Sequence, residues 1–268
     1  AQRWLPQVDG WPNSIWDTGE YEQLDLDADG WVKSLPAPDS PLVHRIVGTL
    51  MLSGEDQYPA GQYVVHYDGK GSLEYGGNAT KNEALSAPGR DVVDVTPTGG
   101  GIYLKITETD SDHTGDYIRN IRIITPGGSC SNDRTQYCES SSVCEGSGIC
   151  ESFEQTYATE RFHPYFLRTI DSFKVLRFMN WLDAWYSTEE NWGERPRLSD
   201  YSWSQSAGGV PIEVAIELSN KLHVDPWINV VARANDEYVR QQAILVRDTL
   251  DPDLTVYLEY TNEAWNTR

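Results

Sequence analysis

Long apolar runs and basic residues are both scarce in this chain of 268 residues. Its longest apolar stretches, such as residues 228–232, are only strand-sized, whereas a membrane-spanning helix needs about 18 or more apolar residues in a row. The 21 Lys and Arg residues stand against 41 Asp and Glu, which gives a net charge of −20. A nucleic-acid-binding protein would need a basic stripe. The sequence therefore predicts no membrane span and no nucleic-acid partner.

Two signatures of cofactor sites are also missing. No Gly-x-Gly-x-x-Gly motif opens a predicted helix, so a dinucleotide-binding fold has no support. Seven, five and five residues separate the four cysteines, and no His lies among them, whereas zinc sites usually contain a Cys-x₂₋₄-Cys pair. We therefore expect no cofactor and no metal.

The cysteines predict two local disulfides instead, with three possible pairings among Cys130, Cys138, Cys144 and Cys150. Disulfides persist in oxidising compartments, so we expect a secreted, extracellular protein. The start at Ala1, without Met or a leader, is typical of a mature form after cleavage. Asn78 begins an Asn-Ala-Thr glycosylation sequon, as expected of a secreted glycoprotein.

Aromatic residues with a polar edge are abundant. The chain has 10 Trp and 15 Tyr but only 5 Phe. Such side chains suit surfaces that grip a partly hydrated ligand, and the flat faces of sugar rings can stack on indoles. The alternative is that several Trp residues simply fill the core.

Three regions can be separated along the chain. Residues 1–40 are rich in Trp, Pro, Asp and Gly, which predicts an extended N-terminal segment. Within it, residues 25–30 resemble the first half of a calcium loop, but Pro36 stands where such a loop needs a Glu, so a tight turn built on Asp side chains is favoured. Residues 41–115 predict a β-sandwich that is a candidate carbohydrate-binding domain. Its expected strands are residues 43–52, 61–67, 72–75, 91–95 and 101–107.

From residue 116 onward, predicted strands and helices alternate. The expected strands are residues 117–124, 174–179, 226–232 and 255–260, and the expected helices are residues 162–173, 210–222 and 236–250. Apolar strands covered by helices favour a parallel sheet. We therefore predict that residues 116–268 form an α/β region, the first half of a (β/α)₈ TIM-type barrel, with a Cys-rich insertion at residues 129–151 after its first strand.

Polar and aromatic residues accumulate where these strands end, which is where βα barrels carry their chemistry. The strand that ends in Asn262-Glu263, flanked by Tyr260 and Trp265, resembles the fourth-strand motif of the retaining (β/α)₈ glycoside hydrolases. This resemblance implies that Glu263 is the general acid/base and that Asn262 contacts the sugar 2-hydroxyl. It also implies, more loosely, that Arg177 orients the nucleophile. The alternative for Glu263 is an exposed loop carboxylate. Residues 40–268 also resemble secreted bacterial proteins described as cellulase-like or carbohydrate-binding.

A long loop after the strand at residues 174–179 is rich in Trp and acidic residues. We interpret it as a substrate-stacking surface, and a self-packed lid is the alternative. The candidate substrate-binding residues are Trp181, Trp185, Trp192, Asn229, Tyr260 and Trp265. Arg233 and Asn235 are further candidates for lining the site, whereas His163, which precedes Pro164 at a helix start, is expected to be structural.

Glycoside hydrolysis takes two carboxyl groups, and in the glycoside hydrolase clan the second lies at the end of the seventh strand. The chain ends at Arg268, after the fourth predicted strand. We therefore expect the nucleophile to come from a missing C-terminal half of the polypeptide or from a further subunit, and this chain alone to be inactive. The predicted partner is a polysaccharide or oligosaccharide. The alternative function is a non-catalytic, structural or carbohydrate-binding extracellular glycoprotein.

Overall fold

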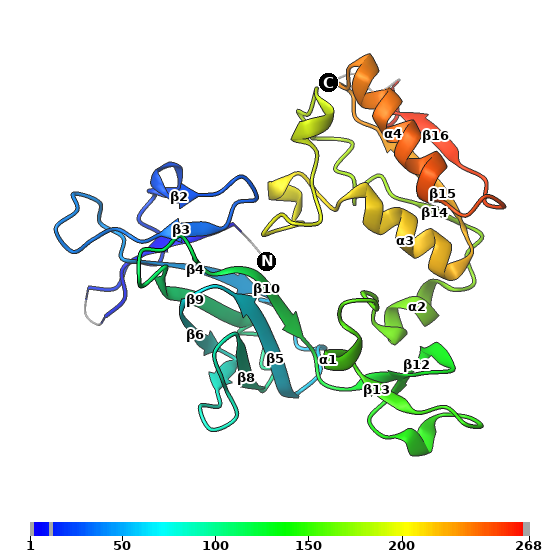
Figure 1. The fold of residues 1–268 in the computed structure, drawn as a ribbon. Coiled ribbons are helices and arrows are strands. Elements are labelled where there is room, and N and C mark those ends of the chain that lie inside the picture. Colours follow the sequence, from blue (N-terminus) through cyan, green and yellow to red (C-terminus); the bar gives the residue numbers. More distant parts are fainter. Residues whose placement is uncertain (1–2, 11–12, 265–268) are drawn as a thin grey trace. The chain divides into compact units, whose positions relative to one another are not determined.

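The computed structural model describes residues 3–10 and 13–264. Contacts divide the chain into two units, residues 1–161 and residues 162–268, which we call the N-terminal and C-terminal units (Figure 1). The domain limits expected at residues 40 and 115 stay predictions. None of the helices in the described residues combines the length and apolar content that crossing a bilayer requires.

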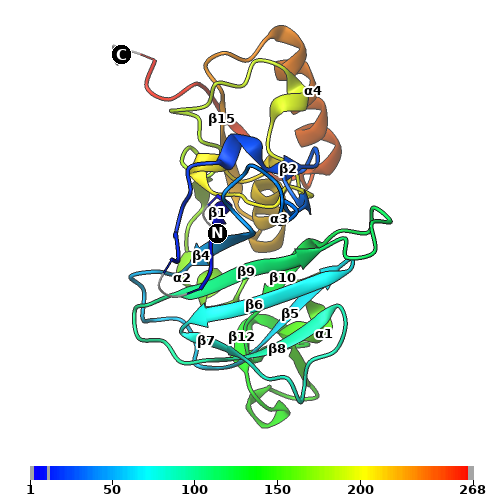
Figure 2. The same ribbon diagram turned by 90° about the vertical axis from the view of Figure 1, so that its left-hand side faces the viewer.

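Two four-stranded antiparallel sheets dominate the N-terminal unit (Figure 2). The first has the order β1 (Leu5–Gln7), β4 (Ile46–Met51), β9 (Ile102–Thr109), β6 (Gly71–Gly77). The second has the order β10 (Arg119–Ile124), β5 (Gly61–Asp68), β8 (Arg90–Val95), β7 (Ala79–Lys81). All five strands predicted between residues 41 and 115 are therefore present.

Side chains alternate across these strands, so each sheet buries one face. Leu104 and Ile106 of β9 are almost completely buried, as are Tyr63 and Val65 of β5. A hydrogen bond from the Tyr75 hydroxyl in β6 to Asp91 in β8 joins the two sheets across the interior. The arrangement is sandwich-like.

The N-terminal segment is extended but anchored. Its short strands β2 (Asp25–Leu26) and β3 (Val32–Ser34) pair with each other, and the one-turn helix η1 (Tyr21–Gln23) precedes them. Asp27 Oδ1 accepts hydrogen bonds from the backbone N–H groups of Asp29 and Trp31, at 2.9 and 2.8 Å. The tight Asp-based turn predicted here is confirmed.

The cysteine region forms a small antiparallel sheet of its own. Strands β12 (Asp133–Cys138), β11 (Gly128–Cys130) and β13 (Cys150–Ser152) are followed by the short helix α1 (Phe153–Thr156). The two predicted disulfides are present and pair Cys130 with Cys144 and Cys138 with Cys150. Each closes a short loop, which in the chain-entropy model stabilises the fold by about 3 kcal/mol.

In the C-terminal unit, a three-stranded parallel sheet has the order β14 (Val175–Arg177), β15 (Asp225–Val230), β16 (Tyr257–Tyr260). Three helices accompany it: α2 (Pro164–Ile170), α3 (Ile212–Leu222) and α4 (Asp236–Thr249) (Figure 1). His163 caps α2 and Asn235 caps α4, each accepting a backbone N–H with its side chain. The structural role expected for His163 is confirmed.

The prediction of half a (β/α)₈ barrel is wrong. Most of the described strands lie in antiparallel sheets, and the expected four-strand series of alternating strands and helices does not occur. The strand expected to open the barrel, residues 117–124, is β10, which pairs antiparallel with β5. Ile124 of β10 is buried in the N-terminal unit. An apolar run reveals a buried strand but not its partner, so periodicity could not separate the two topologies.

Candidate functional site

The carboxyl ends of β14, β15 and β16 bring together polar side chains from all three strands. Arg177 is in register with Trp227, and Asn229 is in register with Glu259. Because residues in register share a face and alternate residues along a strand share a face, these four side chains lie on one side of the sheet. Ile228 points to the other side, where it packs with residues of α2 and α3.

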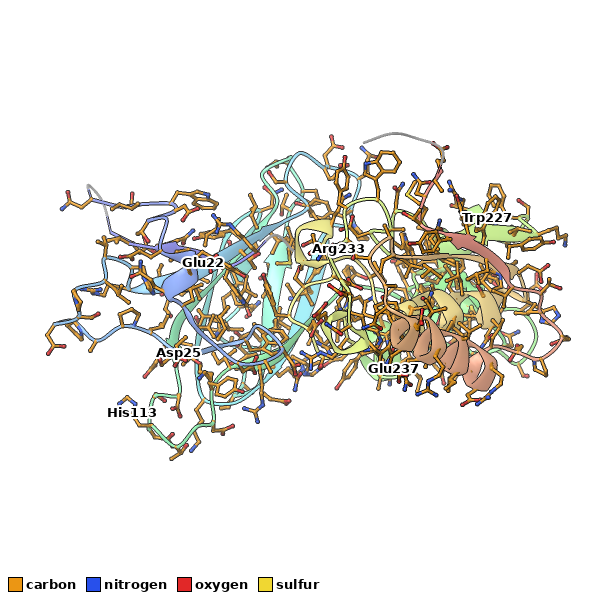
Figure 3. All side chains as sticks on the ribbon, turned by 90° about the horizontal axis from the view of Figure 1, so that it is seen from above. Glu22, Asp25, His113, Trp227, Arg233 and Glu237 are labelled. Carbon is orange, nitrogen blue, oxygen red and sulfur yellow. A yellow bond between two sulfur atoms is a disulfide. The ribbon has the colours of Figure 1, made fainter. Side chains whose placement is uncertain are left out.

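Trp227 thus stands on the face of the sheet opposite the helices. Figure 3 labels it on the side of the sheet away from Glu237 of α4. Trp227 is 36% exposed, and the centroid of its ring lies 6.5 Å from that of Tyr257. The Arg177 guanidinium lies over the indole, 5.0 Å from the ring centroid, in a cation–π contact.

Glu259 is the centre of the hydrogen-bond network at this end of the sheet. Its Oε2 accepts from Arg177 Nη2 at 2.7 Å and Nε at 3.2 Å, from Asn229 Nδ2 at 2.9 Å and from Trp227 Nε1 at 3.0 Å. Its Oε1 accepts from the backbone N–H of Glu263 at 3.1 Å. This carboxylate of β16 therefore fixes groups from β14, from β15 and from the loop that follows β16.

The loop after β16 is held in an unusual backbone conformation. Thr261 has φ 52° and Glu263 has φ 47°, both in the left-handed region that costs a non-glycine residue about 1–3 kcal/mol. Arg177 Nη2 donates to Asn262 Oδ1 at 2.8 Å, and Asn229 Nδ2 donates to the Thr261 carbonyl at 2.7 Å. These bonds stabilise the turn that carries Asn262 and Glu263.

The charge state of Glu259 follows from its surroundings. Burial raises its pKa, but hydrogen bonds from Arg177, from the Glu263 N–H and from Asn229 outweigh that effect, so the pKa lies below its ordinary value. Glu259 is therefore ionised at neutral pH and does not suit the role of a proton donor. Its chemical role is to position its neighbours.

The structure brings together four of the residues predicted from the sequence: Arg177, Asn229, Asn262 and the backbone of Glu263. Tyr260 points elsewhere, because its hydroxyl donates to the Ala232 carbonyl at 2.8 Å. Trp265 lies outside the described residues. Sequence reasoning missed Glu259 and Trp227, although a polar residue within an otherwise apolar strand is the signal that could have revealed Glu259.

The Trp-rich loop after β14 is largely packed against its own unit. Trp181 stacks near Phe166, and Trp192 meets Tyr238 edge-on at 5.2 Å and lies under the Arg195 guanidinium. Trp185, by contrast, lines a cavity of about 210 Å³. Among the candidate Trp residues of this loop, Trp185 thus lines the larger of two cavities, and Trp192 lines one of about 20 Å³.

A second carboxyl group of interest lies in the same loop. Glu189 Oε2 accepts a hydrogen bond from the Tyr238 hydroxyl of α4 at 2.8 Å. Burial raises the pKa of Glu189 to about 6, against the opposing effect of that hydrogen bond. Arg233 and Asn235, also expected near the site, contact this loop instead, through Glu190 and Asn191.

Two groups of three side chains in the described residues bring possible metal-ligand atoms within 4.8 Å of one another. One consists of Cys130, Cys138 and Cys144, which are committed to disulfides. The other is His223 with Asp251 and Asp253, in loops at the amino ends of the parallel strands, with His223 Nε2 3.2 Å from Asp253 Oδ2. Neither group lies at the carboxyl ends of the strands.

The sequon residue Asn78 lies between β6 and β7. Its Nδ2, the atom that would carry a glycan, donates to the Tyr58 hydroxyl at 2.7 Å, and its Oδ1 accepts from Thr98. A glycan would replace the contact with Tyr58, and glycosylation of Asn78 stays a prediction.

Comparisons with protein-family models, with curated proteins and with solved structures found no match. The resemblance of Asn262-Glu263 to the retaining glycoside hydrolases therefore stays a prediction. What the geometry itself provides is a hydrogen-bonding surface with exposed aromatic rings, built on Glu259.

Proposed function

We propose that the carboxyl end of the β14–β16 sheet binds a β-linked oligosaccharide or polysaccharide. The observation that supports this most is the Glu259 network, which fixes Arg177, Asn229 and Asn262 beside the exposed ring of Trp227. Indole and phenol rings offer flat faces for the C–H face of a sugar. A few fixed polar groups beside an apolar surface supply orientation and specificity.

Hydrolysis of the bound glycan is the second candidate function, and Glu263 favours it. Glu263 follows Asn262 at the end of a parallel strand, and Glu259 anchors its backbone N–H. In this proposal Glu263 is the general acid/base. Glu259 does not suit the role of nucleophile, because four N–H donors occupy its Oε2. A retaining mechanism therefore requires another carboxyl group, about 5 Å from Glu263, from a longer form of the polypeptide or from another subunit.

We also propose that the protein is extracellular. Its two disulfides support this location, because such bonds persist in oxidising compartments. An extracellular protein would also meet polysaccharides directly.

Affinity electrophoresis in gels containing soluble β-glucan or xylan tests the binding proposal. We expect retardation of the wild-type chain and at least a tenfold weaker affinity for Trp227→Ala, because the stacking surface is lost. Trp16→Ala is the matched control, since Trp16 is an exposed indole of the N-terminal unit. Equal retardation of wild type and Trp227→Ala would rule out the proposed surface.

Hydrolysis of aryl β-glycosides by the full-length protein tests the second candidate. General acid/base groups contribute about 10²–10⁴-fold to rate, so Glu263→Gln is expected to lose at least a hundredfold. Glu237→Gln, which changes an exposed carboxylate on α4, is the control and should retain full activity. Equal rates for wild type and Glu263→Gln would remove Glu263 from the mechanism.

A further inference from the structure

A pocket of about 450 Å³ opens in the N-terminal unit, between the turn that joins β5 to β6 and residues 81–91. This volume lies in the range of small-molecule binding sites. The side chains that matter for its chemistry are Tyr67, Lys70, Lys81, Glu83 and Asp91. None of them belongs to the site proposed in the C-terminal unit.

The pocket is built around a buried carboxylate. Asp91 is only 1% exposed, and its Oδ1 lies 2.9 Å from Lys81 Nζ. Its Oδ2 accepts a hydrogen bond from the Tyr75 hydroxyl at 2.9 Å. Burying a carboxylate is costly unless it is paired and hydrogen-bonded, so these contacts hold it in one position. Asp91 therefore holds the partly exposed ammonium group of Lys81 in a fixed position at the pocket.

Hydrogen-bonding capacity is left over at the pocket wall. Among the described residues the Tyr67 hydroxyl has no hydrogen-bond partner, while the Tyr67 backbone N–H is anchored to the Gly89 carbonyl. Lys81 has three N–H donors, of which Asp91 takes one, and Glu83 lies 4.0 Å away. The pocket thus offers donors from Tyr67 and Lys81, and an acceptor from Glu83.

The charges at the pocket balance. Lys70 and Lys81 stand against Glu83 and Asp91, and Lys70 is itself paired with Asp112. A charged ligand of either sign would therefore meet a like charge in the pocket. The net charge of −20 further disfavours an anion. A neutral molecule with adjacent hydroxyl groups fits best, because each hydroxyl both donates and accepts.

We infer that this pocket is a second saccharide site, which takes a neutral sugar residue through Tyr67, Lys81 and Glu83. It goes beyond the glycan surface proposed on the parallel sheet, because it lies in the other unit and binds by hydrogen bonds in a pocket. The Tyr67 and Lys81 donors meet sugar oxygens, and the Glu83 carboxylate accepts from a sugar hydroxyl, while the buried Asp91 holds Lys81 in place.

Backbone amide NMR of the labelled full chain tests the inference, with methyl β-D-glucopyranoside and its charged counterpart methyl β-D-glucuronide as probes. We expect the neutral glycoside to shift the amide signals of Lys81 and Gly89, and the glucuronide to bind at least tenfold more weakly. Tyr67→Phe removes one donor and should weaken binding roughly fivefold. Tyr157→Phe, which removes a hydroxyl outside the pocket, should leave the affinity unchanged.

Three outcomes would overturn the inference: no shift at Lys81 and Gly89, equal binding of the glucuronide, or unchanged affinity in Tyr67→Phe. The amide signals of Trp227 and Asn229 report on the parallel sheet in the same titration. If the Trp227 and Asn229 signals do not shift while those of Lys81 and Gly89 do, only the proposed function is refuted. The two proposals can therefore fail separately.

Discussion

The two units bury their sheets differently. In the N-terminal unit, both four-stranded sheets contribute side chains to an interior, and Leu104 is only 1% exposed. In the C-terminal unit, helices cover one face of the parallel sheet, whereas the other carries Arg177, Trp227 and Glu259. Strand β16 is the least covered, with Leu258 66% exposed. A sheet with one open face can present chemistry that a closed sandwich confines to pockets.

The two units also hold their carboxylates differently. Asp91 is almost completely buried and meets one ammonium group and one hydroxyl. Glu259 is partly exposed and accepts from Arg177, Asn229, Trp227 and a backbone N–H. Neutralising Asp91 should therefore lower the free energy of unfolding more than neutralising Glu259 does. Neutralising Glu259 should have the larger effect on ligand affinity.

The largest expected effect comes from comparing a Leu→Ala substitution in the buried strand β9 with one in the exposed strand β16. Leu104→Ala should lower the free energy of unfolding of the N-terminal unit by about 4 kcal/mol, because it leaves a cavity in a closed interior. The same change at the exposed Leu258 should cost less than about 0.5 kcal/mol. Urea denaturation, followed by hydrogen exchange in peptides of each unit, measures both. A large loss in Leu258→Ala would mean that its side chain is covered in solution.

A second, somewhat smaller effect compares the carboxylates through matched amide substitutions. Asp91→Asn should cost about 3 kcal/mol, because it leaves Lys81 beside a neutral group in a mostly buried pair. Glu259→Gln should cost about 1 kcal/mol, since its pair with Arg177 is partly exposed. The same urea experiment gives both values, and equal losses would contradict the assigned difference in burial.

Much of the secondary structure could be predicted from the sequence, but the pairing of strands could not. Residues 61–67 and 101–107 were identified as strands because they are bounded by Gly-rich turns and contain β-branched and aromatic residues, and they correspond to β5 and β9. For residues 117–124, the local pattern fits a barrel strand as well as it fits β10. Only the register with β5, more than 50 residues earlier, decides between them.

The site was predictable where it depended on strand ends. Asn229 was expected there because it lies toward the end of an apolar strand, and Arg177 and Asn262 because of the resemblance to the glycoside hydrolases. The structure places all three in one network. Glu259 was not predicted as a site residue, because its role depends on three strands that lie side by side in the sheet. Trp181 and Trp192 were assigned to a sugar surface on residue type alone, which does not distinguish an exposed indole from a packed one.

The smallest expected effect is on the pH dependence of stability, for which Glu189 and Glu259 act in opposite directions. Burial raises the pKa of Glu189 to about 6, whereas in the unfolded chain a Glu titrates near 4.3. The folded state therefore binds this proton more tightly, so the stability it contributes is fully present below about pH 4.3 and is lost as pH rises through about 6. The pKa of Glu259 is lowered, so its contribution is present above the unfolded value and is lost as pH falls.

As pH rises from about 4.3 to 6, the wild type should lose stability and Glu189→Gln should not. The free energy of unfolding of the variant should therefore rise by about 1 kcal/mol relative to the wild type, because the partial exposure of Glu189 reduces the full effect of the pKa shift. Urea midpoints between pH 4 and 7 measure the difference. Glu259→Gln is the internal control, because the stability that Glu259 contributes is already present above about pH 4.3, so its difference from the wild type should change little over the same rise in pH. Parallel curves for the wild type and Glu189→Gln would show that Glu189 is solvated, and that the loop after β14 lies more open than its contact with Tyr238 indicates.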